Sequence, residues 1–270
     1  MILRALVCLL LLCGPLWAQT PATYLKAEEE ISLHDRQLTR VAESLENWLA
    51  GRLTQAELQK VVGGASKECS AYRALPALVG KTVYARESKL LDQISSFAAQ
   101  TAPDAEGQRR LFLALSELTE SRNEQLISWR QETLRKILAG KLSRDEHNYF
   151  RWELAWLDVW NKENGLTHQL ELGFLEEPGG TSDPRQILKS FLAVRALAEN
   201  IACPSNLETL DATATERLTL LTRTAEQLLR LEKRSSSGAL TRVRRLSRQL
   251  SEITVKFQSE RLKTMARIIN

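Results

Sequence analysis

Two nine-residue segments of the chain, Leu49–Glu57 and Leu138–Glu146, follow nearly the same residue pattern. Each reads Leu-Ala-Gly, a basic residue, Leu, Thr or Ser, two further residues, and Glu. Glycine just past the end of a helix adopts the left-handed backbone conformation without the steric cost of a Cβ atom. We therefore predict that Gly51 and Gly140 each end one helix in that conformation.

The second half of the pattern predicts that another helix begins at once. Thr54 and Ser143 are good N-caps, and a glutamate three residues later can bind the backbone N–H of the cap, which completes a capping box. The pattern thus predicts two tight corners between helices, either as a duplicated hairpin or as two independent solutions to the same turn. It constrains the architecture strongly and implies no chemistry.

The remaining chain is dominated by apolar residues at helical spacing, and glycine and proline, which destabilise helix interiors, are few. A further capping box, Ser205 with Glu208, marks another helix start. The predicted helices cover 24–50, 54–100 with interruptions near Gly63–Gly64 and near Pro76, 103–139, 143–174, 184–201, 205–233 and 238–270. These helices predict an all-α fold, an elongated antiparallel bundle of six to seven long helices built from αα-hairpins.

The first eighteen residues have the pattern of an export signal. A short basic start precedes an apolar run of about thirteen residues, and Ala18 offers a small residue before the cleavage point. Spanning a bilayer takes roughly twenty apolar residues, so we expect cleavage rather than anchoring. We interpret 1–18 as a signal peptide and 19–270 as the helical bundle domain, which could divide into 19–177 and 183–270. The mature chain is then periplasmic or secreted.

Two cysteines, Cys69 and Cys203, remain after removal of the signal. An oxidising compartment favours a disulfide between them, and two separately buried thiols are the alternative. The chain lacks the spacings of Cys and His that are typical of zinc or redox sites.

An aromatic face distinguishes the helix after the second corner. Tyr149, Trp152, Trp156 and Trp160 recur at spacings of three and four and therefore share one side of the helix. One interpretation is that this is the central core helix, because tryptophan buries a large area. The other is that the face binds a partner or lines a pocket for a small ligand.

The last predicted helix is strongly basic. Residues 233–270 carry ten Lys or Arg against two Glu, a net charge of +8 in a chain whose total is +4. The basic side chains could pair with acidic neighbours such as Glu28 in the same bundle, or form a face for an anionic partner. The residues of that face are Arg242, Arg244, Arg245, Arg248, Lys256, Arg261 and Lys263. An apolar stripe on the same helix fits either a partner helix within the chain or a homodimer.

Motifs for catalysis, metals, phosphates and dinucleotides are absent from the sequence, and the three histidines are interpreted as boundary or surface residues. We therefore predict no catalytic residue, no cofactor and no metal. The preferred hypothesis is an exported binding or scaffold protein that engages a protein or an anionic surface, with nucleic acid disfavoured. A small-ligand sensor or carrier with a tryptophan-lined pocket and an enzyme with a dispersed site are the alternatives.

Overall fold

The computed structural model describes residues 20–49, 51–69, 80–99, 105–175, 184–233 and 237–270. Within these ranges all regular structure is helical, and the all-α prediction is confirmed. The helices are α2 (Pro21–Leu49), α3 (Gln55–Cys69), α5 (Lys81–Ala98), α6 (Ala105–Leu138), α7 (Arg144–Leu175), α8 (Pro184–Glu199), the one-turn 3₁₀ helix η1 (Ser205–Leu207), α9 (Glu208–Lys233) and α10 (Ser237–Ile269).

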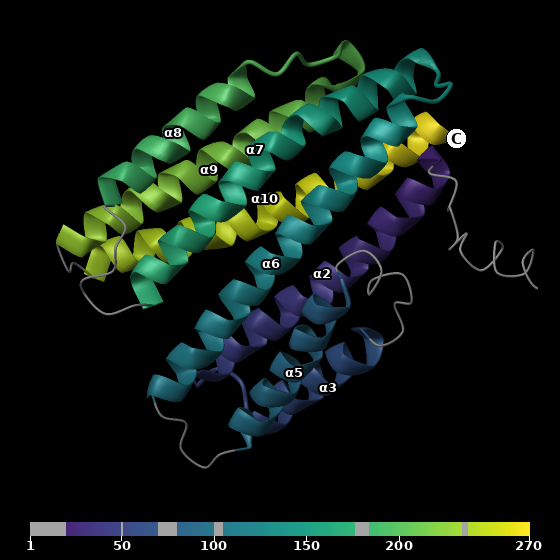
Figure 1. The fold of residues 1–270 in the computed structure, drawn as a ribbon. Helices are drawn as coiled ribbons and strands as arrows, with labels where there is room; N and C mark the ends of the chain where they lie inside the picture. The colour runs from purple at the N-terminus through teal and green to yellow at the C-terminus, as the bar shows by residue number, and fades with distance from the viewer. Residues whose placement is uncertain (1–19, 50, 70–79, 100–104, 176–183, 234–236) are drawn as a thin grey trace, which may run out of the picture.

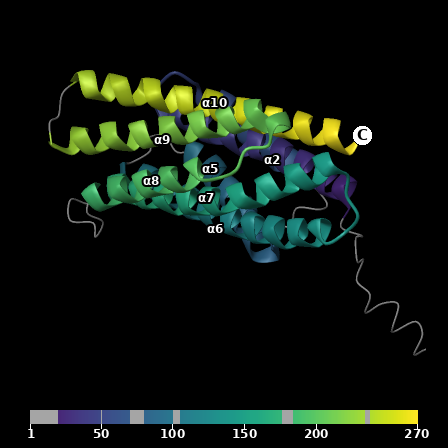
Figure 2. The ribbon, with the colours of Figure 1, turned by 90° about the horizontal axis from the view of Figure 1, so that it is seen from above.

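The described residues form two large apolar cores, which share α2 and α6, and a small cluster between α8 and α9 built from Ile187, Phe191, Leu221 and Ala225. Figure 1 shows α2 and α6 running through the length of the molecule, with α3 and α5 packed against one end. The core at that end is built around Leu45, Leu58 and Ile94. The other core combines α7, α8, α9 and α10 with the remaining turns of α2 and α6. In Figure 2, α9 and α10 lie alongside each other, next to α8 and α7.

The sequence suggested that the helical domain could divide between residues 177 and 183, and the packing of the helices tests this division. Residues 176–183 lie outside the described ranges. The helices on either side of them, α7 and α8, contribute Trp156 and Val194 to one core. The larger core therefore crosses the division that the sequence suggested.

Both corners form the predicted capping boxes. The N–H of Thr54 donates to Glu57 Oε2 at 2.8 Å, and the N–H of Glu57 donates to Thr54 Oγ1 at 3.3 Å. Ser143 and Glu146 make the same reciprocal pair at 2.7 and 3.2 Å. The chain therefore restarts each helix immediately after the turn.

The glycines of the two corners differ. Gly51 has a φ of 68°, and the N–H groups of Gly51 and Arg52 donate to the carbonyls of Trp48 and Asn47, which is the Schellman arrangement. Gly140 does not have a positive φ, so the prediction of a left-handed residue there is wrong. Its N–H instead closes a tight turn to Ile137 O at 3.0 Å, and a Cβ at this position would lie 3.2 Å from the same oxygen. Glycine is therefore favoured at the second corner because a Cβ atom would crowd the carbonyl oxygen of Ile137, and not because the backbone needs a positive φ.

Two other local predictions are wrong. Gly63 and Gly64 do not interrupt the second helix, since both lie inside α3. The buried side chains of Leu58, Val62 and Ala65 anchor this helix, and their packing outweighs the helix-propensity cost of about 1 kcal/mol per glycine. Ser205 does not cap a helix either, because η1 begins after Pro204 without a side-chain cap. The expected break near Pro76 lies outside the described residues.

The predicted disulfide is not formed. Cys203 is exposed and carries a free thiol. Cys69 is the last residue of α3, whereas Cys203 lies in the turn between α8 and η1. Burial, followed by the charges of Asp211 and Glu208, raises the pKa of the Cys203 thiol. The thiolate, which is the reactive form, is therefore disfavoured.

None of the described helices combines the length and apolar character needed to cross a membrane. The predicted signal segment, residues 1–18, lies outside the described residues.

The Schellman turn at Gly51 generates a prediction. Gly51→Ala should lower the free energy of unfolding by about 1 kcal/mol, because alanine is strained at a φ of 68° although the space around it is open. Gly51→Asn should cost about half as much, since asparagine tolerates the left-handed region. Urea denaturation measures both, and equal losses in the two variants would contradict backbone strain as the cause.

Candidate functional site

A buried ionic cluster joins the first and last described helices. Arg261 of α10 donates from Nη1 to Glu28 Oε2 of α2 at 2.7 Å and forms an ion pair with Glu153 of α7. Arg130 of α6 binds both oxygens of Glu28, at 2.7 and 3.0 Å. The Tyr24 hydroxyl donates to Glu153 Oε1 at 2.6 Å. Four helices thus meet at two carboxylates and two guanidinium groups.

The cluster is electrostatically balanced. Burial alone would raise the pKa of Glu28, but Arg130 and Arg261 outweigh it and hold that pKa well below its usual range. Burial disfavours the charged form of Arg261, yet Glu153 and Glu28 raise its pKa above the ordinary value. Burial and the nearby charge of Glu153 raise the pKa of Tyr24 and of Tyr149. The carboxylate and the guanidinium therefore stay charged while both tyrosines stay neutral.

This placement revises the predicted anionic-partner face. Arg261 is only 1% exposed and is paired inside the protein, so it cannot belong to a surface face. For Arg261 the structure shows the alternative, which is pairing with Glu28 inside the bundle. Lys256 and Lys263 are exposed. The side chains of the remaining members, Arg242, Arg244, Arg245 and Arg248, lie outside the described part of the structure.

The aromatic face is also internal. Tyr149, Trp152 and Trp156 are 0%, 2% and 1% exposed, and Trp160 is partly buried. The rings follow one another along α7 with centroids 6.0–6.2 Å apart. Their placement is that of a core helix, and the exposed binding face does not exist at these residues.

One acidic side chain satisfies two of the tryptophans. The indole N–H groups of Trp152 and Trp156 both donate to Asp211 Oδ1 of α9, at 2.6 and 3.0 Å. Trp160 packs its ring against Phe257 at a centroid distance of 5.5 Å, and the Arg261 guanidinium lies 5.9 Å from the Trp160 centroid. The indole N–H groups of Trp152 and Trp156 are therefore used inside the core, whereas the buried Nε1 of Trp160 has no hydrogen-bond partner among the described residues.

A second buried polar cluster was missed by the sequence analysis. His34 of α2 is 1% exposed, which makes its interpretation as a boundary or surface residue wrong. Its Nδ1 lies 2.9 Å from Arg122 Nη2, and its Nε2 lies 2.6 Å from Glu87 Oε1. Arginine can only donate, so Nδ1 accepts and the neutral ring carries its proton on Nε2. Arg122 also pairs with Asp35.

The only sequence signal for this cluster was the position of His34 on an apolar stripe. Its partners come from α5 and α6, more than fifty positions away, and no local pattern indicates them. A third cluster also joins residues that are distant in the sequence. In it, Arg217 of α9 binds Glu163 of α7 and Thr254 of α10. Buried acids and bases in this bundle are paired across helices.

The described residues contain no group of three or more His, Cys, Asp or Glu side chains arranged to hold a metal ion. Two acid–base pairs that could move a proton, His34 with Glu87 and Tyr24 with Glu153, are enclosed by helices, whereas a third, His168 with Glu120, is partly exposed. The burial of the first two pairs suits structural roles better than contact with a substrate.

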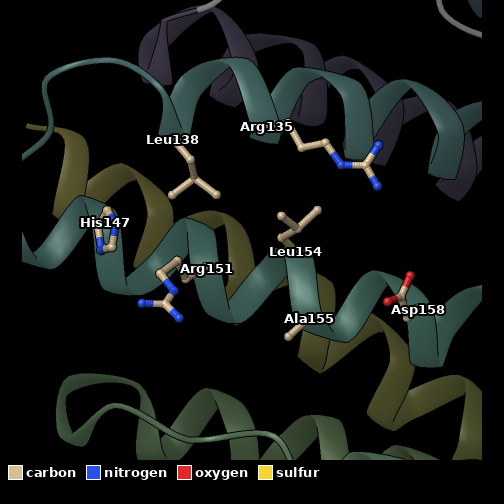
Figure 3. Close-up of a pocket in the computed structure, with 7 residues that line it drawn as sticks. All are labelled: Arg135, Leu138, His147, Arg151, Leu154, Ala155 and Asp158. Carbon is tan, nitrogen blue, oxygen red and sulfur yellow. The ribbon is translucent and has the colours of Figure 1, made fainter.

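The surface presents a groove between α6 and α7, just after the second corner. It has a volume of about 500 Å³ and is lined by Arg135, Leu138, His147, Arg151, Leu154, Ala155 and Asp158. Figure 3 shows Leu138 and Leu154 pointing into the space between the two helices, with the two arginine side chains on opposite sides of Leu154. Asp158 accepts a hydrogen bond from Gln131 at 3.1 Å. The groove thus combines an apolar centre with a mainly cationic rim.

The ionic cluster predicts a specific pH dependence. Glu28→Gln should lower the free energy of unfolding at pH 7 by about 3 kcal/mol, because it leaves Arg130 and Arg261 with one acidic partner fewer. The folded-state pKa of Glu28 lies below its ordinary value of 4.5. Its stabilisation is therefore complete above about pH 4.5 and is lost as the pH falls further.

The difference between wild type and Glu28→Gln should accordingly shrink as the pH is lowered from 4.5. Urea denaturation at a series of pH values measures it, with Glu132→Gln as the control on the exposed surface of α6. A difference that stayed constant down to about pH 3 would contradict the role assigned to Glu28.

Comparison of the chain with protein-family models, with curated protein sequences and with solved structures finds no match. The functional conclusion therefore rests on the residues and their geometry.

Proposed function

We propose that this chain is an exported scaffold protein without catalytic activity, which acts by binding an acidic segment of a partner protein. The observation that carries the proposal is the contrast between interior and surface. The described buried ionisable side chains pair with one another inside the bundle, whereas the α6–α7 groove presents arginines to solvent. Binding is the activity that such a surface supports.

The charge distribution favours an acidic partner. The chain has a net charge of +4, and exposed Lys256, Lys263 and Arg267 add cationic side chains on α10. Arg135 and Arg151 form no ion pair within the described residues, unlike Arg122, Arg130, Arg217 and Arg261. Arginines without an internal partner attract carboxylates, and most strongly at low ionic strength.

The packing of α10 favours a different protein, and not a second copy of this chain, as the binding partner. The apolar stripe of α10, which could have formed a homodimer, contributes Ile253 and Phe257 to the interior of the same chain. α9, α2 and α7 all contact α10. The described part of the stripe therefore already has partner helices.

Export is the part of the proposal that the N-terminal residue pattern supports. Expressed from its own signal, the protein should accumulate outside the cytoplasm with Gln19 as its first residue, because cleavage is expected after Ala18. Intact-mass spectrometry of the exported fraction measures this. Replacement of Leu9 and Leu10 by Arg should stop export, since the apolar run is then broken, and export of that variant would contradict a signal peptide.

Partner chemistry is tested with a defined polyanion. Wild type should bind poly-L-glutamate at about 20 mM salt and release it by about 500 mM, because screening shortens the reach of charge attraction. Isothermal titration calorimetry measures the affinity, with poly-L-lysine as the control polymer. Absence of binding to poly-L-glutamate at the lowest salt would overturn the proposed function.

A further inference from the structure

We infer that the α6–α7 groove is the peptide-binding site, and that it takes an extended segment with an apolar side chain between two carboxylates. This inference rests on the proposed function and gives it a location and a ligand pattern. Another recess also lies on α7. This second recess, between α7 and α8, is smaller at about 360 Å³, and Lys162 is the charged residue among those that line it.

The arrangement of side chains suggests the ligand. Leu138, Leu154 and Ala155 make the apolar centre, and Leu138 and Leu154 are only partly buried although they pack against the larger core. Arg135 and Arg151 lie on opposite sides of this centre in Figure 3. A ligand that satisfies all of them needs an apolar group in the middle and a negative charge on each side.

An extended peptide meets this requirement at alternate positions. Side chains two residues apart point to the same face of an extended strand, about 6.6 Å apart at 3.3 Å per residue. The pattern Glu-x-Leu-x-Glu therefore presents two carboxylates and one leucine to the groove. Guanidinium groups bind carboxylates with paired N–H donors, which adds directionality to the attraction.

The residues around the groove argue against a flat anionic surface, such as a membrane, as its binding partner. Glu132, Asp145 and Asp158 are exposed on the same two helices. A negatively charged membrane brought against this face would meet these carboxylates as well as the arginines. A narrow peptide lying between the helices can reach both arginines and meets only Asp158 among these acids, whose Oδ1 already accepts a hydrogen bond from Gln131.

The test uses a rhodamine-labelled peptide, Gly-Glu-Ser-Leu-Ser-Glu-Gly, and fluorescence anisotropy with the full chain at low salt. The double variant Arg135→Glu with Arg151→Glu should bind about tenfold more weakly or worse, because two attractions become repulsions. Ala155→Trp should weaken binding without any change of charge, since its side chain fills the groove.

The matched control is Arg40→Glu with Arg52→Glu. It changes the net charge equally at exposed positions on α2 and its corner, and it should change the affinity less than twofold. Replacing the leucine of the peptide by serine should also weaken binding, whereas the Lys-Ser-Leu-Ser-Lys version should not bind. Circular dichroism establishes that each variant is folded before its affinity is compared.

Equal weakening by the groove and control variants would overturn the groove while leaving the acidic partner in place. Binding to phosphatidylglycerol vesicles that depends on Arg135 and Arg151, together with no binding of the peptide, would replace the peptide by a membrane and overturn the inference. Failure of wild type to bind either the peptide or poly-L-glutamate would remove the proposed function itself.

Discussion

Arg261 is a cation enclosed between two carboxylates, and the arrangement of the long helices depends on this contact. Moving an ion out of water costs several kcal/mol, which the pairing with Glu28 and Glu153 must offset through close geometry. A shift of α10 by one turn would leave Arg261 and Glu153 buried without an ionic partner and Glu28 with Arg130 alone. Apolar packing alone tolerates such shifts more readily, so the cluster selects one register of α10 against α2 and α7.

The local elements could be predicted from the sequence. Capping at Thr54 and Ser143 depends on residues only three positions apart, and helix boundaries depend on patterns within a single segment. Gly140 shows where such reasoning fails, because a shared motif adopted a different backbone solution. Gly63 and Gly64 show that core packing can preserve a helix that intrinsic propensity alone would interrupt.

The site could be predicted much less well, for a physical reason. The partners of Arg261 are 108 and 233 positions away, and those of His34 are 53 and 88 positions away. Which face of a helix meets which neighbour is decided by packing across the whole bundle. A basic, amphipathic helix therefore has the same local pattern whether its arginines point inward or outward. The tryptophans of α7 were ambiguous for the same reason, and the groove joins residues from two helices that no motif connects.

The pairing of Arg261 with Glu28 has a consequence for how the chain is made. Synthesis proceeds from the N-terminus, so Glu28, Arg130 and Glu153 all leave the ribosome well before the arginine that completes their cluster. Until α10 arrives, any collapse of the earlier helices must leave one of these charges hydrated or unpaired. The larger core, to which α10 contributes Phe257 and Met265, therefore closes only after nearly the whole chain has been made.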